Sequence, residues 1–114
     1  MESLEFQQTE SPSGALSISV KGALTLKQLF EFQDLIRRDQ SKSLILDLSA
    51  VSYMDSAALG AILGAYASCE RTGRGFAVAG VSPRVLTLFE VAGVDKLLPL
   101  FDSVEAAEKQ LSSK

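Results

Sequence analysis

The stretch LILDLSAVSYMDSAALGAIL, residues 44–63, contains the succession of elements that decides the fold. An apolar run typical of a strand covered on both faces leads into a short polar turn, and Asp55 and Ser56 then precede a run of small apolar residues. This order predicts a central strand, a turn and a helix that begins at Ser56. The Ser56 hydroxyl group is therefore expected at an exposed helix N-terminus, where backbone N–H groups attract anions. A phosphate added there would change the charge at the edge of a docking surface.

The bulk composition fits one domain that spans residues 1–114. Hydrophobic residues make up 46% and charged residues 22% of the chain, which is the balance of a globular protein with an adequate core. The single cysteine excludes an internal disulfide and a cysteine-rich metal site. Histidine is absent, which removes the commonest general base and metal ligand. We therefore expect no metal, no cofactor and no enzymatic activity.

The charge distribution bears on partners and location. The net charge is −3 and no basic run is present, which argues against a nucleic-acid partner. The first ten residues lack the positive and apolar regions of a signal peptide. No uncharged apolar run approaches the roughly 18 residues of a membrane span. We expect a cytoplasmic protein without a membrane-inserted segment.

The N-terminal third predicts a hairpin followed by a helix. Alternation of apolar and polar residues over 4–8 and 16–20 predicts two antiparallel strands, and Gly22 is expected to end the second strand. Thr25 is the expected N-cap of a helix that runs to about Gln40. The apolar stripe of this helix is expected to consist of Leu26, Leu29, Phe30, Phe32, Leu35 and Ile36.

The rest of the chain alternates strands and helices. Strands are predicted at 44–48, 76–79 and 98–101, and helices at 56–71, from Pro83 to Gly93, and after Ser103. The resulting order is β-β-α-β-α-β-α-β-α. Such an order predicts an α/β fold in which the later strands are mostly parallel.

Asp55 and Ser56 have two interpretations. In the structural interpretation one of them caps the helix, as Asp and Ser do at many helices. In the functional interpretation the second candidate cap is redundant, and the pair follows a central strand, where open α/β folds place functional loops. The sequence leaves both open.

The helix after Ser56 carries no charged residue as far as Cys69. Leu59, Ile62, Leu63 and Tyr66 have the spacing of a core-facing stripe. The outer face is then left with small residues, namely Ala57, Gly60, Ala61, Gly64, Ala67 and Ser68. A glycine within a helix costs roughly 1 kcal/mol against alanine, so two of them four residues apart indicate that another backbone comes close. That backbone belongs either to a neighbouring helix of the same domain or to a docking partner.

For four other residues near this motif, a purely structural role is one interpretation. Asp47, inside the central strand, is expected to have a structural role, either capping a loop or holding the turn at Asp55. Tyr53 and Met54 are either core residues or contact residues. Cys69 is expected to be a small apolar residue of the helix.

Taken together, these features resemble a STAS domain, the family of bacterial anti-sigma factor antagonists. The resembling segments are LSISVKGALTL (16–26), residues 44–63, GFAVAGVSPRVLTLFEVAGVDKLL (75–98) and the terminal helix. The most specific part is Asp47 followed by Asp55-Ser56 and Leu59-Gly60. The resemblance implies one mixed, mostly parallel sheet with about four helices packed mainly on one face.

The resemblance also implies a mode of action. A family antagonist binds an anti-sigma factor that is also a serine kinase, and so releases a sigma factor. The kinase phosphorylates a serine at the start of the second helix, which expels the antagonist, and a phosphatase resets it. Ser56 takes the acceptor role here, in a monomer or weak dimer. The implied partner contacts are Thr25, Tyr53, Met54, Asp55, Ser56, Ala57, Gly60, Ala61 and Gly64.

Two departures from the family pattern keep a second hypothesis open. Antagonists often carry Ser-Ser-Gly or Ser-Thr-Gly after the aspartate, whereas Ala57 and Ala58 follow Ser56 here. They also often read Gly-Glu-Leu-Asp after the second strand, whereas Thr25 ends the corresponding sequence here. The alternative is a constitutive, non-phosphorylated subunit that docks on an ATPase, for example in a lipid-transport complex.

Overall fold

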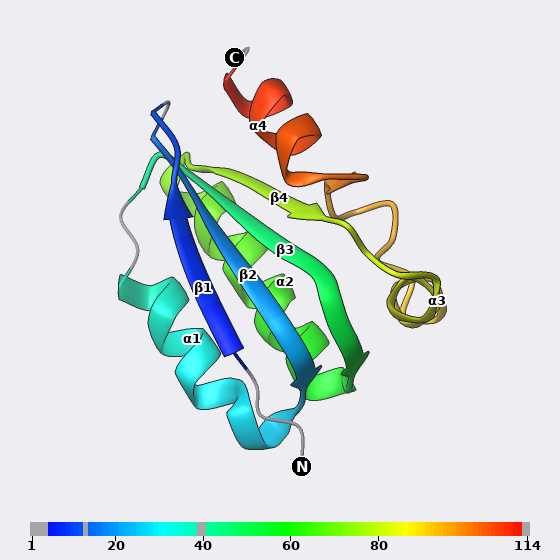
Figure 1. The fold of residues 1–114 in the computed structure, drawn as a ribbon. Helices are drawn as coiled ribbons and strands as arrows, with labels where there is room; N and C mark the ends of the chain where they lie inside the picture. Colours follow the sequence, from blue (N-terminus) through cyan, green and yellow to red (C-terminus); the bar gives the residue numbers. More distant parts are fainter. Residues whose placement is uncertain (1–4, 13, 39–40, 113–114) are drawn as a thin grey trace.

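The computed structural model describes residues 5–12, 14–38 and 41–112, and Figure 1 shows their fold. The predicted strand start at Leu4 and helix end at Gln40 lie outside these residues. The predicted order of strands and helices is confirmed. The elements are β1 (Glu5–Glu10), β2 (Ala15–Leu24), the 3-10 helix η1 (Leu26–Gln28), α1 (Leu29–Arg38), β3 (Ser43–Met54), α2 (Ser56–Thr72), β4 (Gly75–Ala79), α3 (Pro83–Val91), β5 (Leu100–Phe101) and α4 (Val104–Ser112).

The strands form one sheet in the order β1-β2-β3-β4-β5. β1 runs antiparallel to β2, and the other neighbours are parallel. The expected mixed, mostly parallel sheet of an α/β fold is therefore confirmed. Parallel pairing brings the carboxyl ends of β2 and β3 to one edge of the sheet, and the chain enters η1 and α2 from that edge.

Three helices cover one face of the sheet, and the fourth covers part of the other. The main core contains fully buried side chains from α1, α2 and α3, such as Phe32, Ile62 and Phe89. A smaller cluster lies on the opposite face beneath α4, around Ile45 and Ala107. Figure 1 shows α2 passing behind the strands, with α4 apart from the other helices. The expectation that the helices lie mainly on one face is confirmed.

β2 and β3 are longer than predicted, so two sequence-based expectations are wrong. Gly22 does not end β2, and residues 49–54 are not a polar turn, because pairing continues from Gly22 with Val51 to Leu24 with Met54. Gly22 adopts φ +112°, a conformation that glycine tolerates, next to a register shift in the β2–β3 ladder. The irregular ladder explains why simple alternation failed to reveal the strand ends.

The first helix begins as a 3-10 turn and buries fewer residues than its apolar stripe predicts. Leu29 and Phe32 are buried as expected. Leu26 and Phe30 are 69% and 77% exposed, so their assignment to the core is wrong. These two residues are four apart and share a second, outward-facing stripe.

Gly80 lies where β4 separates from β3. Its φ is +71°, and a Cβ atom added there would lie 2.7 Å from the Cβ of Ser49. The last β3–β4 pair joins Asp47 to Ala79, so this close approach marks the point at which the chain leaves the sheet for α3.

We predict that Gly80→Ala lowers the free energy of unfolding by about 2–4 kcal/mol, because backbone strain adds to a steric overlap with β3. Gly93→Ala is the matched control, since Gly93 has φ +75° but open space around its Cβ position, and should cost about 1 kcal/mol. Urea denaturation measures both. Equal losses would contradict the close approach.

Candidate functional site

The carboxylate of Asp55 joins the starts of two helices. Its Oδ1 accepts a hydrogen bond from the N–H of Ala58 at 2.9 Å, which makes Asp55 the N-cap of α2. Its Oδ2 accepts from the N–H of Leu26 at 3.0 Å, at the start of η1. The N–H of Asp55 in turn donates to the carbonyl of Leu24 at 3.4 Å. One half-buried residue therefore connects the three segments: its side chain holds the starts of the first and second helices, and its backbone N–H holds the end of β2.

Thr25 is at the N-cap position of η1 but does not cap it. Its backbone is extended, and its side chain makes no capping hydrogen bond. The prediction that Thr25 caps the first helix is thus wrong, because the carboxylate of Asp55, which follows the neighbouring strand β3, takes that place. Thr25 is still close to the site, because it directly precedes Leu26, whose N–H is bonded to Asp55.

Ser56 is the first residue of α2 and its side chain is exposed. Asp55 performs the capping, so the hydroxyl group of Ser56 is not needed for that purpose. At this end of a helix the first N–H groups, those of Ser56 and Ala57, have no acceptor within the helix. The arrangement presents a hydroxyl group beside backbone donors that favour negative charge.

A cleft of about 660 Å³ opens beside Ser56, between the start of α2 and α3. α3 contributes Arg84, Thr87, Leu88 and Val91, which are spaced i, i+3, i+4, i+7 along one face of the helix, together with Val85. β3 and α2 contribute Tyr53, Met54, Asp55 and Ser56. Val91 is 82% exposed and Tyr53 49%, so apolar surface lies within reach of the Ser56 hydroxyl group.

Tyr53 and Met54, each predicted to be either a core residue or a contact residue, differ in the structure. Met54 is a core residue with 5% exposure, and its place in the ladder opposite Leu24 points its side chain inward. Tyr53 points to the other side of the strand and is exposed. Of the two, only Tyr53 offers a large accessible surface.

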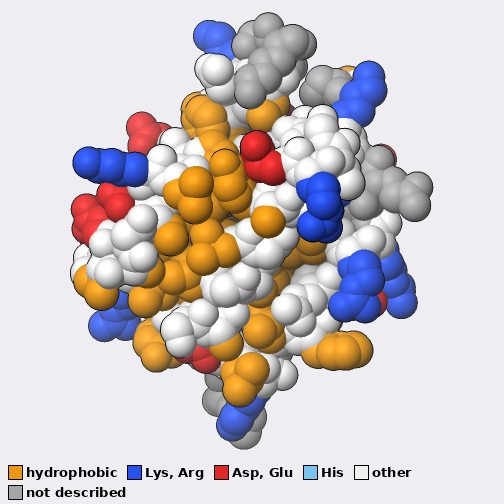
Figure 2. All heavy atoms as spheres, turned by 180° about the vertical axis from the view of Figure 1, so that it is seen from behind, with side chains coloured by type: hydrophobic (Ala, Val, Ile, Leu, Met, Phe, Trp, Pro, Cys, Tyr) orange, Lys and Arg blue, Asp and Glu red, His pale blue; other side chains and the backbone are white. Residues whose placement is uncertain are grey.

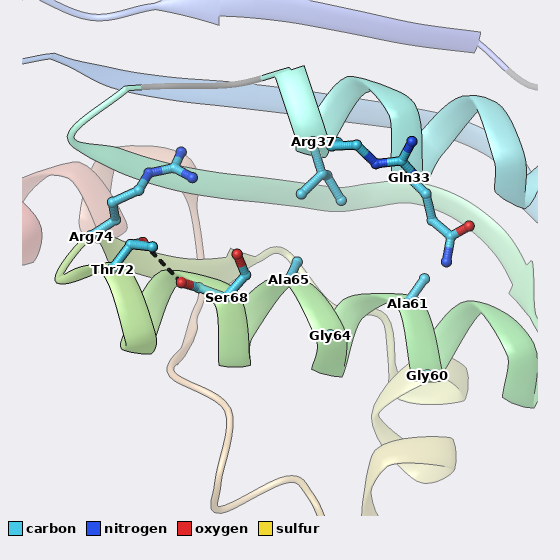
Figure 3. Close-up of a pocket in the computed structure, with 10 residues that line it drawn as sticks. Gln33, Arg37, Gly60, Ala61, Gly64, Ala65, Ser68, Thr72 and Arg74 are labelled. Carbon is cyan, nitrogen blue, oxygen red and sulfur yellow. Dashed lines mark hydrogen bonds between the residues drawn. The ribbon is translucent and has the colours of Figure 1, made fainter.

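A second groove, of about 610 Å³, lies between α1 and α2 (Figure 3). Gly60 and Gly64 lie on its α2 side, and a Cβ atom added to either would meet nothing within 4 Å. Tight packing of these glycines against another helix of the domain is therefore excluded for the described residues. Ala61 lines the same groove but is only 9% exposed, so its assignment to the outer face is wrong.

Asp47 does not take part in the site. Its Oδ1 accepts from the N–H of Ser49 at 3.0 Å, where the β2–β3 ladder shifts register. It is eight positions from Asp55, about 26 Å along an extended strand. Both predicted structural roles are therefore wrong, because the hydrogen bond of Asp47 lies within β3 and involves neither a loop nor the turn at Asp55.

Four exposed residues, two on the first helix and two on α3, were not recognised as such from the sequence. Leu26 and Phe30 were assigned to the core, and Arg84 and Val91 were not singled out, although all four are exposed. The i, i+4 spacing of Leu26 and Phe30, off the main stripe, was the available signal. Figure 2, which views the helical face, shows hydrophobic side chains gathered over its centre with most charged side chains toward the margins.

The described residues contain no group of three His, Cys, Asp or Glu side chains placed to hold a metal ion. In the same part of the chain, no helix has the length and apolar character needed to cross a membrane.

Comparisons with known proteins agree with this fold. The family model of the STAS domain matches residues 6–107. The anti-sigma F factor antagonist of Paenibacillus polymyxa is 34% identical over 73 residues, which cover 64% of this chain and 62% of that relative. The anti-sigma-B factor antagonist of Staphylococcus aureus (strain NCTC 8325 / PS 47) is 29% identical over 101 residues, 86% of this chain and 94% of the relative. The crystal structure of an anti-sigma factor antagonist from Mycobacterium paratuberculosis has a TM-score of 0.85 at 24% identity, over 96% of this chain and 94% of that one.

We predict that Asp55→Ala lowers the free energy of unfolding by about 2 kcal/mol, because two helix starts lose their acceptor together. Ser82→Ala is the matched control, since Ser82 caps only α3 through the N–H of Val85, and should cost about 1 kcal/mol. Chemical denaturation compares them. A loss for Asp55→Ala no larger than that for Ser82→Ala would contradict the double role.

Proposed function

The chain belongs to the STAS domain family, and on that premise we propose that it is an anti-sigma factor antagonist switched off by phosphorylation of Ser56. Proteins of this kind are regulatory binding proteins rather than enzymes. In the proposed cycle, the unphosphorylated protein binds an anti-sigma factor with serine kinase activity and so releases a sigma factor. A phosphatase restores the unphosphorylated form. The cycle takes place in the cytoplasm.

The observation that carries the proposal is that Asp55 caps the helix and leaves the hydroxyl group of Ser56 exposed. Asp55 uses both carboxylate oxygens to hold the backbone, and the adjacent Ser56 hydroxyl group is exposed at the mouth of the helix. Modification of Ser56 would therefore leave the capping hydrogen bonds in place. This is the arrangement expected of a surface that changes its charge without changing its fold.

The surface around Ser56 supports a docking role. Leu26 and Phe30 are exposed on the first helix, Tyr53 is exposed on β3, and Val91 is exposed at the end of α3. Between them, α2 presents Gly60 and Gly64, with open space around their Cβ positions. A partner can approach the backbone of α2 closely there and cover the apolar side chains on either side.

A phosphate on Ser56 would oppose that docking. It brings about −1.5 to −2 charges to a surface that already carries the Asp55 carboxylate. The helix N-terminus tolerates this charge, but a partner that covers it must remove water from it and meets like-charge repulsion wherever it is acidic. The phosphate thus lowers affinity for the partner more than stability of the fold.

Because Ala57 and Ala58 lack hydroxyl groups, Ser56 is the one residue at the start of α2 that can accept a phosphate. Ala58 is fully buried and its N–H is bonded to Asp55, while Ala57 is half-buried. A hydroxyl group at either position would be less accessible than that of Ser56. The departure thus removes neighbouring acceptors without altering the position of Ser56.

The Thr25 departure favours a second candidate, a constitutive subunit that docks on an ATPase without phosphorylation. Thr25 adjoins Leu26, whose N–H is bonded to Asp55, so a missing carboxylate at position 25 changes the charge beside Ser56. A partner that recognises an acidic residue there would not find it. This candidate uses the same apolar surface, and it differs in requiring no chemical change at Ser56.

We predict that incubation with ATP and the serine kinase encoded beside its gene adds one phosphate, which intact-mass spectrometry detects and peptide mapping places on Ser56. Ser56→Ala is the control and should show no mass increase, because the described neighbours Ala57 and Ala58 lack hydroxyl groups. A stable complex with an ATPase that forms without any phosphate would support the constitutive subunit instead.

We also predict that Gly60→Ala and Gly64→Ala each raise the free energy of unfolding by about 0.5–1 kcal/mol, since the added methyl groups meet open space in a helix. The same variants should weaken binding to the anti-sigma factor, measured by calorimetry, because the partner backbone can no longer approach. Stabilisation with unchanged binding would place the docking surface elsewhere.

A further inference from the structure

Arg84 lies on the cleft that Ser56 lines, on the opposite element. It follows Pro83 in the first turn of α3, and its side chain is exposed. Among the residues that line this cleft it carries the only positive charge, and Asp55 the only negative one. Among the described residues, no carboxylate forms an ion pair with Arg84.

The guanidinium group of Arg84 has the chemistry to bind a phosphate. It carries a positive charge and presents several N–H donors in a planar fork that matches two phosphate oxygens. Arg84 lies in the first turn of α3, so the positive end of the α3 helix dipole is close to it. The start of α2 contributes a second positive dipole end at Ser56. Two helix starts and one unpaired arginine therefore adjoin the cleft beside Ser56.

We propose that Arg84 binds the phosphate group of phosphorylated Ser56 across the cleft between α2 and α3. This inference rests on the proposed function, because it requires a phosphate on Ser56. In the unphosphorylated protein, Arg84 on α3 and Ser56 on α2 line the same cleft. With the phosphate, a charge-assisted hydrogen bond links α2 to α3.

The link would add a second effect to the charge of the phosphate. The cleft between the two helices is lined by Leu88, Val91 and Tyr53, which are the apolar residues available to a partner on this side. A phosphate held over the cleft by Arg84 covers that surface and fixes the spacing of α2 and α3. Phosphorylation then withdraws part of the docking surface as well as adding charge to its edge.

Phosphorus-31 NMR of protein carrying genetically encoded phosphoserine at position 56 tests the inference. A nearby guanidinium favours the doubly charged phosphate, so the second proton dissociation constant of the phosphoserine should be about two to five times larger in the wild-type background than in Arg84→Gln. Arg84→Lys should keep part of the difference. Arg71→Gln is the matched control, because Arg71 is exposed in the last turn of α2 and lines neither cleft, and should titrate as wild type does.

The outcome that overturns the inference is a phosphoserine that titrates identically in the wild-type and Arg84→Gln backgrounds, with both folded by circular dichroism. Arg84→Lys provides a second comparison if the glutamine variant is unfolded, since loss of the whole difference on this change would exclude a charge-based contact. The phosphate is installed during translation, so the result does not depend on any kinase. A kinase that leaves Ser56 unmodified would overturn the proposed function, whereas an Arg84-independent titration overturns only this inference.

Discussion

The carboxylate of Asp55 is the constraint on which the arrangement of the site depends. It accepts hydrogen bonds from two backbone N–H groups, those of Leu26 and Ala58, that lie 32 positions apart in the sequence but together in space. Each bond gives an acceptor to a backbone N–H group at a helix start, which has no acceptor within its own helix. Because β2 and β3 are parallel neighbours, their exits reach the same edge, and one side chain can serve both helices. The position of Ser56 follows directly.

This anchoring places two adjacent side chains in different surroundings. Both carboxylate oxygens of Asp55 accept hydrogen bonds from backbone N–H groups, while the side chain of Ser56 is exposed at the start of the same helix. A charge added to Ser56 would alter the exposed surface without breaking the hydrogen bonds that hold the helix starts. The placement of α4 on the other face of the sheet contributes as well, since it leaves the outer side of α2 uncovered within the described residues.

The sequence was sufficient for the fold and for the start of α2, because alternating strands and helices with strong cap and turn signals produce regular patterns. It failed where contacts are irregular or distant. The register shifts near Gly22 concealed the length of β2 and β3, and the stripe of α1 did not distinguish Leu26 and Phe30 from core residues. The second partner of Asp55 is 29 residues away, so no local pattern reveals that its carboxylate, and not Thr25, serves the first helix.

The most direct test of the account is a calorimetric titration of the anti-sigma factor with two forms of this protein, one with Ser56 unmodified and one with phosphoserine at that position. The account predicts that the unmodified form binds and that the phosphate weakens binding at least about 100-fold, a loss of roughly 3 kcal/mol. Equal affinities for the two forms would contradict the switch and leave Ser56 as an ordinary exposed residue beside a permanent docking surface.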